Sequence, residues 1–132
     1  MINRIINVVA GTFVAVLFTA PTAAAQQMPM KAPASKEVTV TGTVVDVSCK
    51  FGQGLTGDDH RMCAQVCSDR GIPLAILTAD GKLYIPVSAS MPGDAQNDKL
   101  KEFAERKVTV KGKAFEAGGA QAIQIASVVA AR

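Results

Sequence analysis

Three cysteines and one histidine form the one constellation in this sequence that could carry specific chemistry. Cys49, His60, Cys63 and Cys67 fall within nineteen residues, and they are all the cysteines and histidines of the 132-residue chain. Three thiolates and an imidazole are the ligand set of a closed tetrahedral zinc site, and thiolates also bind copper(I) well. We therefore interpret these residues as candidate ligands of one zinc or copper ion, and the sequence leaves the choice of metal open.

The positions of the four residues require two elements to meet. On an α-helix, which turns about 100° per residue, His60, Cys63 and Cys67 lie within about one sixth of the circumference and form one stripe. Cys49 is expected at the end of a preceding strand, and the glycine-containing loop from Lys50 to Gly57 would allow the helix to fold back over it. The spacing is not that of a familiar zinc finger, so the metal hypothesis depends on this convergence.

Oxidation of the cysteines gives two alternatives that the sequence leaves open. A disulfide from Cys49 to Cys63 or to Cys67 would connect strand and helix, whereas a Cys63–Cys67 bridge would require the helix to unwind. The odd cysteine count would leave one thiol over. The first alternative is therefore a disulfide-stabilised binding module that recognises a protein, peptide or sugar, and the second is a thiol redox protein.

An enzyme is not the expected function. Cys63 and His60 could be written as a nucleophile and its base, but the sequence shows no third residue that would orient the histidine and no loop that would form an oxyanion hole. We assign no catalytic residue on this ground.

Several segments of the chain have the pattern of β-strands. β-Branched residues are dense from Val38 to Ser48, and two apolar runs flank Asp80-Gly81, a strong hairpin signal. Two further strands are expected at Val108–Phe115 and Ala122–Val129, which gives five in all. Gly42 and Gly112 occupy matching places in VTVTG and VTVKG, where a strand could bend.

Two short helices complete the prediction. The first, Asp58–Arg70, carries His60, Cys63 and Cys67 and ends at Gly71; the second, Asp94–Arg106, places apolar residues at helical spacing. The order of strands and helices resembles the OB-fold, a five-stranded Greek-key barrel. The expected fold is therefore mainly β, with the Cys/His-bearing helix inserted between the first two strands.

A local pattern adds a second resemblance. Cys49, His60-Arg61-Met62-Cys63-Ala64-Gln65-Val66-Cys67 and Gly71-Ile72-Pro73 together resemble the pattern of small uncharacterised exported bacterial proteins with an OB-like domain. The resemblance implies export and a Cys/His site. It brings no assigned reaction, so the function has to be argued from ligand chemistry.

The N-terminus predicts export to the periplasm or secretion. Arg4 precedes an apolar stretch, Pro21 closes that stretch, and Ala23-Ala24-Ala25 supplies the small residues that signal peptidase requires. We expect a signal peptide over residues 1–25, a flexible lead-in rich in proline and polar residues over 26–36, and a barrel domain over 37–132. No membrane anchor is expected after cleavage.

Composition gives little indication of a macromolecular partner. Cleavage removes Arg4 from the 14 basic residues, which leaves 13 against 11 acidic ones. The charges are mixed along the chain, which has one tyrosine and no tryptophan for base stacking. Nucleic acid is therefore not an expected partner. A periplasmic protein partner would suit a copper-handling role, and the oligomeric state stays open.

Overall fold

The computed structural model describes residues 33–132. The predicted signal peptide and all but the end of the predicted lead-in lie outside the described residues. The first strand, β1, begins at Ser35, three residues earlier than the sequence pattern indicated. Within the described residues, no helix has the length and apolar composition needed to span a bilayer.

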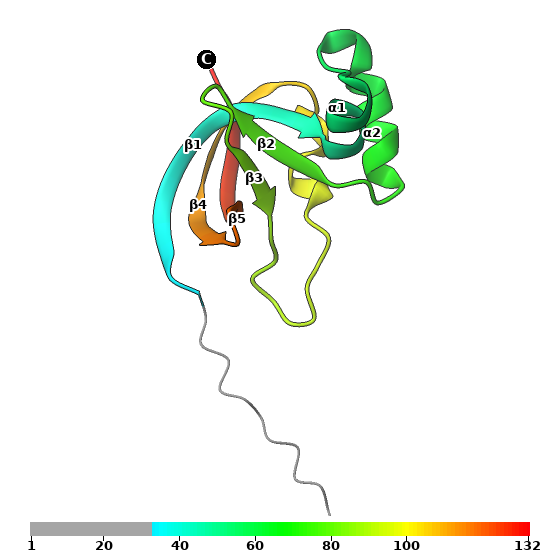
Figure 1. The fold of residues 1–132 in the computed structure, drawn as a ribbon. Helices are drawn as coiled ribbons and strands as arrows, with labels where there is room; N and C mark the ends of the chain where they lie inside the picture. Colours follow the sequence, from blue (N-terminus) through cyan, green and yellow to red (C-terminus); the bar gives the residue numbers. More distant parts are fainter. Residues whose placement is uncertain (1–32) are drawn as a thin grey trace, which may run out of the picture. The chain divides into compact units, whose positions relative to one another are not determined.

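Five strands close into a barrel. The strands are β1 (Ser35–Asp46), β2 (Leu74–Thr78), β3 (Leu83–Pro86), β4 (Lys107–Ala117) and β5 (Ala120–Ala130). They join in the order β1-β2-β3-β5-β4, with every pairing antiparallel except β3 with β5 (Figure 1). The prediction of an OB-like five-stranded barrel is confirmed, and β2 and β3 form the hairpin expected around Asp80-Gly81.

The long first strand closes the barrel because it serves two neighbours. Its N-terminal part pairs with β4 and its C-terminal part with β2, and the two ladders overlap at Gly42 and Thr43. Alternate side chains of the strands point inward, as their period of two requires. The core they form with the segment after β3 consists of Val40, Val44, Leu74, Ile76, Leu100, Val108, Val110 and Ile123.

Gly112 permits a close approach between two strands. The register between β4 and β5 shifts at Lys111/Gly112, and a Cβ added at Gly112 would lie 2.0 Å from the carbonyl oxygen of Gln124. We expect Gly112→Ala to lower the free energy of unfolding by about 2–3 kcal/mol, because backbone would have to move. Urea denaturation measures this change.

Gly52 provides the matched control. A Cβ at this helical position would have nothing within 4 Å. Gly52→Ala should therefore be neutral or stabilise by up to about 1 kcal/mol. Equal destabilisation by the two substitutions would contradict the close approach at Gly112.

The Cys49 region differs from the prediction. The first strand ends at Asp46, and Val47–Gln53 forms a short helix, α1, where a strand end and a loop were expected. The Asp46 side chain accepts a hydrogen bond from the Cys49 amide and caps this helix, and Gly54 ends it in the left-handed conformation. Cys49 therefore lies on a helix, and the prediction that it ends a strand is wrong.

The helix predicted over Asp58–Arg70 is present as two pieces. A single 3-10 turn, η1 (Asp58–His60), leads directly into α2 (Arg61–Asp69), and Gly71 has a φ of 88° just beyond its end. The insertion of the Cys/His-bearing helix between β1 and β2 is confirmed. Figure 1 shows α1 and α2 together beside the end of β1 and the start of β2.

The helix predicted over Asp94–Arg106 is absent. Two 3-10 turns, η2 (Asn97–Lys99) and η3 (Lys101–Phe103), occupy this segment instead. The chain leaves helical geometry at Ala104 because Glu105 donates its amide to the carbonyl of Val44, and Arg106 accepts the Val44 amide, at 2.8 and 3.0 Å. A continuous helix would lose this attachment to β1.

Candidate metal centre

The three cysteines converge from two helices. Cys49 on α1 and Cys63 and Cys67 on α2 place their sulfur atoms within 4.8 Å of one another, and all three are free thiols. Zinc–sulfur bonds of about 2.3 Å at tetrahedral angles separate sulfurs by about 3.8 Å. The expected meeting of Cys49 with the helical cysteines is confirmed, and a shift of about 1 Å would suffice to enclose an ion.

His60 approaches the same place from the buried side. One of its ring nitrogens, a sulfur of Cys49 and a carboxylate oxygen of Asp46 lie within 4.8 Å of one another, so Cys49 belongs to both groups. Nδ1 of His60 is 3.0 Å from Oε1 of Glu105, whereas Nε2 is buried without a hydrogen-bond partner. Nε2 is therefore the ring nitrogen that remains for an ion.

Glu105 holds the His60 ring in place. Its Oε2 accepts hydrogen bonds from the Thr56 hydroxyl at 3.0 Å and the Gly57 amide at 2.9 Å, and its side chain is fully buried. It also adopts a φ of 60°, which is rare for a residue other than glycine and costs energy. A carboxylate on the second nitrogen of a metal-binding histidine fixes the ring and its tautomer.

We expect Glu105→Gln to weaken ion binding by about 10–100-fold. The glutamine carbonyl can satisfy Thr56 and Gly57, but its NH₂ group would then face Nδ1 of His60. That arrangement puts the proton on Nε2, where it blocks an ion. Chelator-competition titration of the purified protein measures the loss.

Glu102→Gln is the control for this substitution. Glu102 lies three residues earlier in the same segment with an exposed side chain, and its neutralisation should leave affinity unchanged. Wild-type affinity in Glu105→Gln would show that the carboxylate does not position His60.

Asp46 is the second carboxylate that the sequence did not point to. It is fully buried, and Oδ1 accepts the Cys49 amide at 2.9 Å. Oδ2 is also buried, and no hydrogen bond of normal geometry reaches it. An aspartate immediately before a helix is the usual N-cap signature, but here it was assigned to the interior of a strand.

The environment keeps two of the thiols protonated. Burial, reinforced by the Asp46 carboxylate, raises the pKa of Cys49. The placement of the Cys67 thiol to donate toward Asp46, followed by burial, raises the pKa of Cys67 to about 12. A reactive cysteine requires a lowered pKa, so neither residue suits a nucleophile. An ion would have to displace these protons, and its affinity should rise with pH.

The same surroundings argue against Cys49 as a catalytic nucleophile. Glu105 supplies the orienting residue that the sequence did not reveal, so Cys49, His60 and Glu105 have the composition of a nucleophilic triad. Cys49 is only 7% exposed, however, and its pKa is raised. A buried, protonated thiol is a poor nucleophile for a substrate in solvent.

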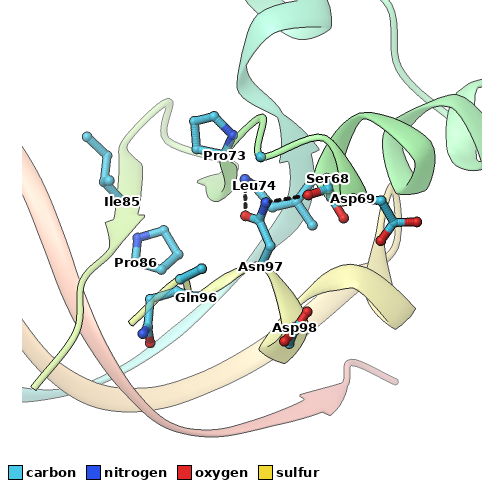
Figure 2. Close-up of a pocket in the computed structure, with 11 residues that line it drawn as sticks. Ser68, Asp69, Pro73, Leu74, Ile85, Pro86, Gln96, Asn97 and Asp98 are labelled. Carbon is cyan, nitrogen blue, oxygen red and sulfur yellow. Dashed lines mark hydrogen bonds between the residues drawn. The ribbon is translucent and has the colours of Figure 1, made fainter. Parts of the chain in front are cut away.

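Side-chain bonds from the segment between β3 and β4 hold α2 in place. Asn97 donates to the carbonyls of Ser68 and Ile72 at 3.0 and 2.8 Å and accepts the Leu74 amide at 3.0 Å. Figure 2 shows the bonds to Ser68 and Leu74 beside an open cavity of about 410 Å³. The segment that carries Glu105 therefore also fixes the C-terminal end of the cysteine-bearing helix.

No known protein-family model, curated protein or solved structure matches this chain. The function is therefore argued from the site itself.

Proposed function

We propose that this protein is a small exported metal-binding protein that holds one zinc or copper ion through Cys49, His60, Cys63 and Cys67. The observation that carries the proposal is the overlap of the two groups at Cys49: three sulfurs meet on one side, and a buried imidazole nitrogen without a partner lies on the other.

Two buried polar atoms support an ion at this place. Nε2 of His60 and Oδ2 of Asp46 both lack hydrogen-bond partners. A buried polar atom without a partner costs about 1–3 kcal/mol, and more if it is charged. A cation coordinated by the imidazole beside the carboxylate would remove both penalties. Neither a disulfide nor a thiol redox role would do so.

Export is part of the proposal, and the residues before the barrel support it. The basic start, the apolar stretch and Ala23-Ala24-Ala25 have the pattern of a secretory signal. Three free thiols in an oxidising compartment are unusual unless they are bound or reactive. An ion held by all three would protect them from oxidation.

The ion would serve the fold, a partner protein, or both. A domain of about 100 residues buries only about two thirds of its unfolded surface, so a cross-link between its elements has a large effect on its stability. An ion here would join α1, α2 and η1 to the Glu105 segment. Cys63, the exposed member of the set, is where a partner's ligand could reach the ion.

The test is elemental analysis combined with thiol counting on protein purified from the periplasm. We expect about one equivalent of zinc or copper, which His60→Ala and Cys67→Ser should lose. Met62→Leu is the control, because this exposed sulfur side chain adjoins Cys63 but belongs to neither group. One disulfide with no ion would instead support the binding module, and thiols that follow the redox buffer would support the redox protein.

A further inference from the structure

The two groups that share Cys49 differ in their chemistry. The outer group contains sulfur alone, which suits a soft ion such as copper(I). The inner group adds the imidazole of His60 and a carboxylate of Asp46, which suit a borderline divalent ion such as zinc. The ion that the site prefers therefore depends on whether Asp46 acts on it.

We propose that Asp46 is a further, specificity-determining residue of this site, and that it favours zinc over copper(I). The proposal rests on the proposed function, because it presumes that the cluster binds an ion.

The position of Asp46 is the first argument. Its role as helix cap uses only Oδ1, through the Cys49 amide. The Cys67 thiol is placed to donate toward Asp46, but Oδ2 is fully buried and accepts no hydrogen bond of normal geometry, in a group whose other members are candidate ligands. Among the described residues, no lysine or arginine forms an ion pair with Asp46. A buried carboxylate without a cation is costly, and an ion beside Oδ2 would neutralise it.

The charge of the site is the second argument. Three thiolates and the Asp46 carboxylate carry four negative charges around one ion. Zinc reduces this charge to two, whereas copper(I) leaves three. Like charges repel more strongly in a poorly solvated site than in water, so the extra charge of zinc gains more here than at the surface.

The hardness of the ligand is the third argument. Carboxylate oxygen is a regular zinc ligand but a poor partner for copper(I), which prefers thiolate and thioether. Asp46 therefore contributes to zinc binding and gives copper(I) nothing beyond repulsion between its charge and the thiolates.

Asp46→Asn isolates this effect. Asparagine keeps an oxygen for the Cys49 amide and is as good a helix cap as aspartate, but it removes the charge. Wild-type and variant protein, stripped of metal and kept reduced without oxygen, are titrated with zinc and with copper(I) against chelators. We expect the ratio of zinc affinity to copper(I) affinity to fall at least tenfold in the variant, mainly through loss of zinc affinity.

Asp59→Asn is the control, because this exposed carboxylate precedes His60 and belongs to neither group. Its ratio should match the wild type. If Asp46→Asn fails to fold, Asp46→Ser tests the loss of the same charge with another residue that caps helices well.

An unchanged ratio would overturn the inference. Whether both affinities stay at the wild-type value or fall by the same factor, it would show that Asp46 serves only as a helix cap, while the metal site itself would stand. Wild-type protein that binds neither ion would instead remove the proposed function, and the inference with it.

Discussion

Cys49→Ser is expected to abolish stoichiometric ion binding and to weaken it more than any other single substitution in the cluster. Cys49 is the one residue in both groups, so its loss removes a ligand from the sulfur side and from the His60 side together. A serine hydroxyl is a weak substitute for thiolate. The loss should exceed ~1,000-fold, beyond the ~100-fold upper range for partners that only support a ligand. Chelator competition and elemental analysis measure it.

Cys63→Ser is the matched comparison for this prediction. Cys63 is exposed and belongs to the sulfur group alone, so the inner group of Asp46, Cys49 and His60 survives its removal. We expect clear but smaller weakening. Equal losses in the two variants would contradict the central place of Cys49, and circular dichroism of both variants excludes unfolding as the cause.

The barrel could be predicted from the sequence because its signals are local. Alternation along β4 and β5 and the Asp80-Gly81 turn each need only a few neighbouring residues to be recognised. Gly42 and Gly112 also indicated where strands bend, and the structure places Gly42 where the two ladders of β1 overlap and Gly112 at a register shift.

The prediction of a helix over Asp94–Arg106 was wrong because a distant contact overrides the helical spacing of the apolar residues in this segment. Leu100 and Ala104 are buried as a helix would bury them, but backbone bonds to Val44 extend the chain after η3. Val44 is about sixty positions away, so helical spacing carries no information about it.

The candidate site was likewise predictable only where its signals are local. Cys63 and Cys67 lie one turn apart on α2, so local periodicity was enough to pair them, whereas the structure groups His60 with Asp46 and Cys49. Glu105 lies 45 residues from His60 and meets it only through the folded barrel. Asp46 was locally visible as a helix cap, but the β-branched residues around it favoured a longer strand.

Removing the ion is expected to lower the melting temperature of the protein by about 10 °C or more. An ion at ~1,000 times its dissociation constant stabilises the folded state by about 4 kcal/mol, and 1 kcal/mol shifts the midpoint by about 4–8 °C in a domain of this size. The expected shift is smaller than these two numbers multiplied together, because the four candidate ligands lie within nineteen residues. The unfolded chain therefore keeps some affinity for the ion.

Scanning calorimetry with and without a chelator measures the shift, and His60→Ala supplies the comparison. Folding adds to the unfolded chain what the local sequence lacks, namely the Glu105 bond that aims Nε2 of His60. The variant should therefore melt at one temperature whether or not chelator is present. If wild-type protein that carries an ion melts unchanged in chelator, the folded site binds no more tightly than the unfolded segment, and convergence on the barrel contributes nothing to affinity.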